Sequence, residues 1–165
     1  SLRYETTWGG ARPGTGRPVR GTRRTVAHRR RPTHKARFPL HVTLRARGGL
    51  PSFREGAIAA EIRAAIGAAS RDAFRVVHFS IQGNHLHLVV EGHDARAVTR
   101  GMQGLAVRVA RAVNRLLGVR GRVFRERYHA RELTTPRAVR NAIVYVLMNA
   151  RKHGVRLASG VDALS

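Results

Sequence analysis

Alternating apolar and polar residues predict three strands that each bury one face. The first covers residues 40–47, and two more, at about residues 74–82 and 85–91, are separated by Gly83-Asn84, a pair typical of a tight hairpin turn. The core-facing side of the second strand is expected to comprise Val77, Phe79 and Ile81. The polar side of the three strands would carry His41, Thr43, Arg45, His78, Gln82, His85 and His87.

Apolar residues at three- and four-residue intervals predict two helices around these strands. The first helix would begin at a capping box formed by Ser52 and Glu55. The second would be capped by Asp94 and ended by Gly118. Their buried stripes would consist of Ile58, Ile62 and Ile66 in the first, and of Val98, Met102, Leu105, Val109, Val113 and Leu116 in the second.

A fourth, less regular strand is expected over about residues 122–133. A third helix then opens at Thr135-Pro136, with proline at the first helical position, and runs to about His153. The first six elements predict an α+β fold of the ferredoxin-like type, β-α-β-β-α-β, with two helices on one face of an antiparallel sheet. The other face would then be an open, polar platform of the kind that suits nucleic acid.

Composition divides the chain into three parts. Residues 1–36 predict a basic flexible arm, because the segment mixes Gly, Pro, Thr and Arg with few apolar residues. Residues 37–154 are expected to form the folded domain, and residues 155–165 a C-terminal tail.

The net charge is extreme, with 32 Lys and Arg against 9 Asp and Glu, which gives +23. Such a charge repels itself and favours a polyanionic partner, nucleic acid first and an anionic membrane surface second. The sequence has no long apolar stretch and no apolar leader, so we expect a cytoplasmic, nucleoid-associated bacterial protein. It has no cysteine, which excludes disulfides, thiolate nucleophiles and thiolate metal sites.

His85 and His87 are the first candidates for chemistry. They are two residues apart on a strand, so both side chains project to the same side. Two neighbouring imidazoles can hold a divalent cation if a third ligand comes from elsewhere in the fold. The spacing alone is a weak signal, because a bare pair of this kind is more often structural or on the surface.

Tyr145 and Asn149 are neighbours on the third helix, one turn apart. They lie away from an apolar arc that consists of Val139, Ala142, Ile143, Val146 and Ala150. A tyrosine at such an edge can pack its ring and wet its hydroxyl, or it can serve as a nucleophile. Tyr128, on the expected fourth strand, is the rival nucleophile.

Four segments in this order resemble the HUH-type single-tyrosine transposases, most of all the group associated with repetitive extragenic palindromes (REP). Residues 83–90, Gly-Asn-His-Leu-His-Leu-Val-Val, resemble the N-H-x-H-L signature of this family. Residues 145–151 resemble its Y-I-x-x-N-P-x-R segment, with Ala150 in place of the usual proline. Residues 41–45 and 127–129 resemble its H-V-T-x-R and R-Y-x strands.

The resemblance implies a metal-dependent transposase that cleaves and rejoins single-stranded, hairpin-bearing DNA. Tyr145 would be the nucleophile, and His85, His87 and Asn149 would hold Mg²⁺ or Mn²⁺. The product would be a 5′-phosphotyrosine with a free 3′-hydroxyl, formed in two transesterification steps. The candidates for DNA contact are His41, Arg45, Arg127, Arg131, Arg140, Arg151 and Lys152.

Three other interpretations stay open at this stage. The chain could be a basic module, or an inactive domesticated transposase, that binds nucleic acid without cutting it. It could be a basic protein of the membrane surface, although its helices lack a broad apolar face with aromatic anchors. It could be a metal hydrolase, although no carboxylate base stands near the histidines. The protein could act as a monomer or as a homodimer in which the tyrosine helix serves the partner's site.

Overall fold

A computed structural model of the chain describes residues 34–152, with side chains up to Met148. The predicted tail and nearly all of the predicted arm lie outside the described residues. The elements in chain order are β1 (Leu40–Arg45), α1 (Gly56–Gly67), β2 (Phe74–Ile81), β3 (His85–Gly92), α2 (Ala95–Leu117), β4 (His129–Glu132) and α3 (Pro136–Lys152). None of the described helices has the length and apolar character needed to span a membrane.

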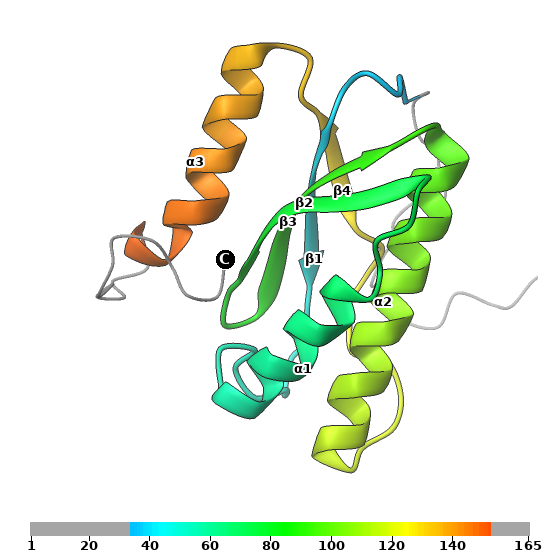
Figure 1. The fold of residues 1–165 in the computed structure, drawn as a ribbon. Helices are drawn as coiled ribbons and strands as arrows, with labels where there is room; N and C mark the ends of the chain where they lie inside the picture. Colours follow the sequence, from blue (N-terminus) through cyan, green and yellow to red (C-terminus); the bar gives the residue numbers. More distant parts are fainter. Residues whose placement is uncertain (1–33, 153–165) are drawn as a thin grey trace, which may run out of the picture. The chain divides into compact units, whose positions relative to one another are not determined.

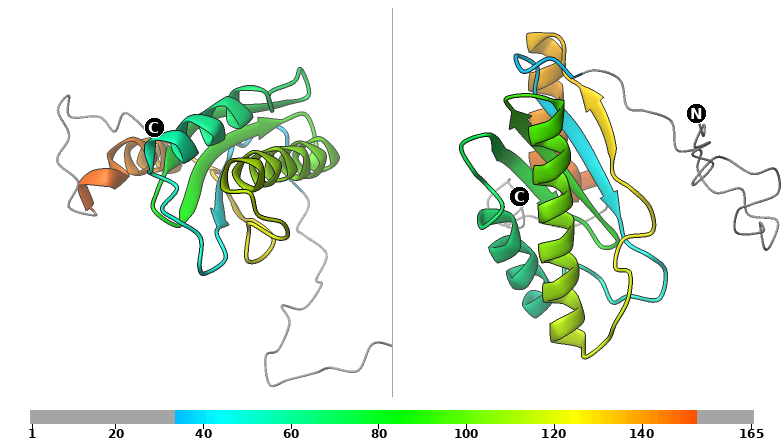
Figure 2. Two further views of the ribbon diagram at one scale, coloured as in Figure 1. Left: turned by 90° about the horizontal axis from the view of Figure 1, so that it is seen from below. Right: turned by 90° about the vertical axis from the view of Figure 1, so that its right-hand side faces the viewer.

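The four strands form one antiparallel sheet in the order β2-β3-β1-β4. Helices α1 and α2 lie on one side of this sheet and α3 on the other (Figures 1 and 2). The predicted α+β, ferredoxin-like arrangement is therefore confirmed. The sheet face predicted to be open is covered in part, because α3 packs against β2 and β3.

The main core lies between the sheet and the helices α1 and α2, and its largest buried side chains come from the strands, from both helices and from the loop residue Phe53. The Asp94 carboxylate accepts a hydrogen bond from the Ala97 amide at 2.6 Å and so caps α2. Gly118 ends that helix with a left-handed φ of 62°. The buried stripe of α2 is as predicted up to Val113, but Leu116 is 43% exposed because it turns away from the sheet in the last turn.

Three predicted details of the elements are wrong. Val77 is an extra residue in a β-bulge between Val76 and His78, so its side chain leaves the core face and is 44% exposed. The fourth strand is only four residues long, because residues 122–128 form a loop in which Phe124 makes one isolated bridge to Ala46, just after β1. Helix α1 begins at Gly56 and not directly after Ser52: the Glu55 carboxylate accepts from the Ser52 amide at 3.1 Å, as in a capping box, but Ser52 Oγ accepts from the Arg54 amide, so the pair closes a turn before the helix.

Two glycines of α2 are expected to respond oppositely to alanine substitution. A Cβ at Gly101 would lie 2.2 Å from the ring of Phe74, which is 2% exposed and cannot move aside. Gly101→Ala should therefore destabilise the fold by about 1–3 kcal/mol. A Cβ at Gly104 meets nothing within 4 Å, so Gly104→Ala should stabilise the helix by roughly 0.5–1 kcal/mol. Urea unfolding of the two variants measures both effects, and equal midpoints would contradict the packing of α2 on β2.

Candidate active site

Helix α3 is held against the sheet by a small apolar cluster. Val89 is the one fully buried apolar residue on the α3 side of β3, and it packs with Leu133, Ala142 and Val146. At the start of the helix, Thr135 Oγ1 accepts a hydrogen bond from the Ala138 amide at 3.1 Å. This packing brings the middle of α3 over the histidines of β3.

The two histidines of β3 lie side by side on this face, with His85 at the start of the strand. Their ring centroids are 4.7 Å apart, with the rings nearly perpendicular. In the sheet register His87 is opposite Thr43, and His85 is opposite Arg45. His87 is only 6% exposed, so its place is set by packing and hydrogen bonding rather than by solvent.

The Nδ1 atom of each histidine is engaged by a neighbouring polar side chain. His85 Nδ1 donates to the Asn84 Oδ1 at 2.7 Å, and His87 Nδ1 lies 3.2 Å from Thr43 Oγ1. Partners of this kind fix the orientation of histidines that bind metals through the other nitrogen. On both residues Nε2 is therefore the nitrogen suited to a cation. Asn84 and Thr43 were not predicted as site residues, although each adjoins a predicted one in the turn or on the same sheet face.

Tyr145 meets this pair from α3. Its hydroxyl oxygen is 3.5 Å from His87 Nε2, and the two ring centroids are 5.1 Å apart in an edge-to-face arrangement. The two residues are 58 positions apart in sequence. The structure thus brings the predicted nucleophile and a predicted metal ligand together within one chain.

His41 completes an aromatic cluster with His87 and Tyr145. Its ring stacks on His87 at 5.2 Å and meets the edge of Tyr145 at 5.8 Å. Its Nε2 is buried and has no hydrogen-bond partner among the described residues. Burial, and then the positive charge of Arg131 on the neighbouring strand, lower the pKa of His41 below its ordinary value. The neutral form of the His41 imidazole is thus favoured, and its ring packs against the rings of both His87 and Tyr145.

The folded protein is expected to lose stability as the pH falls below about 6.5, partly through His41. The unfolded chain takes up this proton first, because the folded-state pKa lies lower, so the contribution is present above pH 6.5 and lost below it. His41→Gln should flatten the dependence measured by urea unfolding between about pH 7.5 and 5.5. His93→Gln, which changes an exposed histidine after β3, is the control. Identical pH dependence in the His41 variant and the wild type would contradict the assignment.

The described residues offer two nitrogen ligands to the predicted metal site. The two Nε2 atoms can act as ligands, but no group of three His, Asp or Glu side chains that could hold a cation occurs among residues 34–148. The predicted third ligand, Asn149, lies in α3 one turn after Tyr145, and its side chain is outside the described residues. The side chains of Arg151 and Lys152 also lie outside the described residues.

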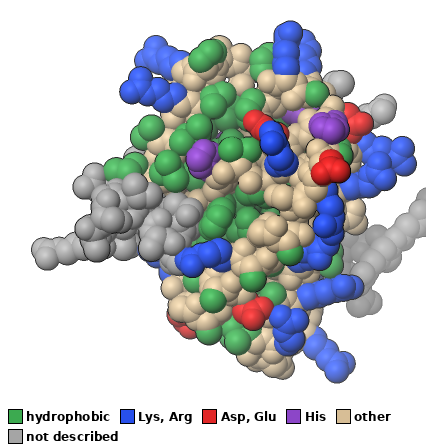
Figure 3. All heavy atoms as spheres, viewed as in Figure 1, with side chains coloured by type: hydrophobic (Ala, Val, Ile, Leu, Met, Phe, Trp, Pro, Cys, Tyr) green, Lys and Arg blue, Asp and Glu red, His purple; other side chains and the backbone are tan. Residues whose placement is uncertain are grey.

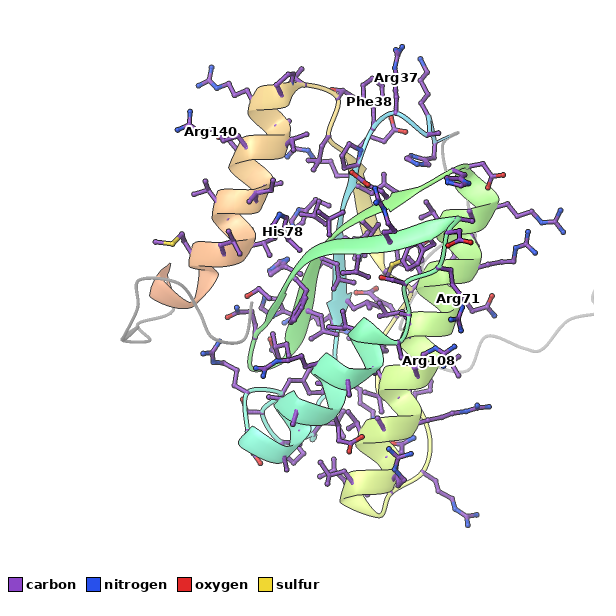
Figure 4. All side chains as sticks on the ribbon, in the orientation of Figure 1. Arg37, Phe38, Arg71, His78, Arg108 and Arg140 are labelled. Carbon is purple, nitrogen blue, oxygen red and sulfur yellow. The ribbon has the colours of Figure 1, made fainter. Side chains whose placement is uncertain are left out.

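The two candidate tyrosines lie in different environments. Tyr128 comes just before β4 and packs against the main core under α1 and α2, whereas Tyr145 packs in the cluster under α3. Of the arginines predicted to contact DNA, Arg45 and Arg131 extend the histidine face, opposite His85 and His41. Arg140 points away from the sheet on α3, while His78 lies between α3 and β2 (Figure 4).

Comparison with known proteins gives a fold relationship. No protein-family model and no curated protein sequence matches the chain. Among solved structures, one described as a REP-associated tyrosine transposase bound to a REP hairpin is similar, with a TM-score of 0.61 and 16% sequence identity. The similarity covers 78% of this chain and 75% of that one, so the two share their fold over most of their length.

Proposed function

We propose that the protein is a DNA transposase or endonuclease that cleaves and rejoins single-stranded, hairpin-bearing DNA with Tyr145 as the nucleophile. The observation that carries this proposal is the approach of the Tyr145 hydroxyl to His87 Nε2, at 3.5 Å. A nucleophile beside a pair of potential metal ligands is an arrangement suited to metal-assisted phosphoryl transfer.

The chemistry is a pair of transesterifications. The Tyr145 oxygen attacks the scissile phosphorus in line, the phosphorus–O3′ bond breaks, and a 5′-phosphotyrosine forms. The phenol proton is released to solvent and the departing 3′ oxygen takes up a proton. In the second step a 3′-hydroxyl attacks the phosphotyrosine and releases the phenol, so the energy of the phosphodiester is conserved.

The residues around Tyr145 orient the reacting groups. His41 and the apolar cluster under α3 pack against the tyrosine, and Thr43 and Asn84 hold the two histidines. Mg²⁺ or Mn²⁺ held by His85, His87 and Asn149 would polarise the scissile phosphate and stabilise its developing charge. Two imidazoles with engaged Nδ1 atoms fit such an ion.

The choice of substrate rests on charge and on the structural relative. The net charge of +23 favours a polyanion, and the similar transposase structure is described as bound to a hairpin. A single strand has unpaired bases and a flexible backbone, so it can bend to bring the scissile phosphate to Tyr145 on α3 more readily than a stiff duplex can.

The proposal is tested by incubating the protein with a hairpin-bearing single strand, with Mg²⁺ or Mn²⁺ and with a chelator. We expect a nicked strand and a covalent protein–DNA adduct whose mass maps to Tyr145, and neither product in chelator. Binding without nicking or adduct would contradict the proposal and leave a nucleic-acid-binding module.

A further inference from the structure

Five arginines from two distant segments gather at the end of the sheet next to His85. The end of β1 and the residues just after it contribute Arg45 and Arg47, and the loop between α2 and β4 contributes Arg122, Arg125 and Arg127. These five residues are called the arginine edge here. The two segments lie side by side in the right-hand view of Figure 2.

Backbone hydrogen bonds join the two segments. The Arg47 amide donates to the Val123 carbonyl at 2.8 Å, and the Arg125 amide donates to the Arg45 carbonyl at 2.9 Å. Between them Phe124 packs edge-to-face on the buried Phe53. The loop is thus anchored to the core, and its arginines are carried on a fixed support.

Two of the guanidinium groups are also fixed by main-chain carbonyls. Arg47 Nε donates to the Arg122 carbonyl at 2.6 Å, and Arg122 Nη2 donates to the Arg125 carbonyl at 2.8 Å. Such ordering brings like charges together and lowers the entropic cost of binding a ligand with several negative groups.

The positive charge of the arginine edge is balanced by almost no negative charge within its two segments. The one acidic residue in these two segments is Glu126, and its carboxylate lies 3.6 Å from His129 Nε2. Arg45, Arg122, Arg125 and Arg127 are exposed. A group of uncompensated guanidiniums on an anchored backbone is suited to a row of phosphates, which arginine can bind with two parallel hydrogen bonds.

The position of the arginine edge favours nucleic acid over other polyanions as its ligand. Arg45 is directly opposite His85 in the sheet register, so the arginine edge is continuous with the candidate active site. We propose that the arginine edge binds the backbone phosphates of the DNA segment that flanks the scissile phosphate. This inference rests on the proposed function and adds the tract by which the strand is guided to Tyr145.

The test compares two sets of substitutions that remove the same charge. The first set is Arg45→Gln, Arg125→Gln and Arg127→Gln. The control set is Arg100→Gln, Arg108→Gln and Arg111→Gln on the exposed side of α2, across the sheet from α3. Arg108 is labelled in Figure 4, and several basic side chains lie along the right-hand edge of the molecule in Figure 3.

Binding of a labelled hairpin with a single-stranded tail is measured against salt concentration, with all variants in a Tyr145→Phe background. The first set should weaken binding roughly tenfold or more, and lower the slope of log affinity against log salt by about two. The control set should change both quantities much less. Equal losses in the two sets, or equal competition by polyglutamate and by DNA, would overturn the proposal.

This readout does not require cleavage. If the wild type forms no adduct but the first set still loses binding selectively, the proposed function fails and the arginine edge stands as a nucleic-acid surface. If the adduct forms and both sets bind alike, the arginine edge fails and the proposed function stands.

Discussion

Tyr145→Phe is expected to abolish covalent attachment to DNA while the protein still folds and binds the strand. The substitution removes one oxygen atom, the one that lies 3.5 Å from His87 Nε2. The ring remains, and with it the edge-to-face contacts with His41 and His87. Because the phosphotyrosine cannot form without this oxygen, both cleavage and rejoining should be lost. Mass spectrometry and denaturing electrophoresis of the protein–DNA adduct measure the effect.

Tyr128→Phe is the matched control. Tyr128 packs against the main core, on the other side of the sheet from α3, and its loss of a hydroxyl should leave adduct formation within about twofold of the wild type. An adduct that persists in Tyr145→Phe, or one that disappears in Tyr128→Phe, would reverse the assignment of the nucleophile.

Replacement of either histidine of the pair, His85→Ala or His87→Ala, should lower the rate of adduct formation at least about 100-fold. Each variant removes one nitrogen that faces the reaction. The same variants should lose binding of Mn²⁺, which calorimetry or electron paramagnetic resonance detects without any DNA. His93→Ala changes an exposed histidine outside the site and should alter neither property.

Thr43→Val tests the predicted role of His87 with a milder change. It keeps the shape of the side chain near His87 but removes the oxygen 3.2 Å from His87 Nδ1. Partners of this kind usually change metal affinity or activity about 10- to 100-fold, so the loss should be smaller than for His87→Ala. Unchanged Mn²⁺ binding in His85→Ala and His87→Ala would show that the pair is not a metal site.

Local patterns were sufficient for most of the fold. The alternation in β1 and β3, the Asp94 cap and the glycine at position 118 each appear where the sequence places them. They are readable because each depends on residues a few positions apart. The bulge at Val77 was not readable, since an unpaired residue arises only when β2 and β3 adopt one register.

The candidate site likewise has features that the sequence could predict and features that depend on tertiary packing. That His85 and His87 share a side follows from the two-residue period of a strand, and that Tyr145 and Asn149 are adjacent follows from the helical turn. The approach of Tyr145 to His87 could only be expected by resemblance, because it depends on where α3 lies on the sheet. Val89, apolar on a polar strand face, is the sequence signal that a helix would cover this place.

By itself, the sequence determined the types of residue available for chemistry, the faces on which they stand and the excess of positive charge. Tertiary structure alone decided that His41 is enclosed by His87 and Tyr145, and that Arg45 and Arg125 are neighbours. Both facts come from contacts between segments far apart in the chain, whose geometry is set by the packing of the whole sheet and its helices. A periodicity of two or of 3.6 residues carries no information about such contacts.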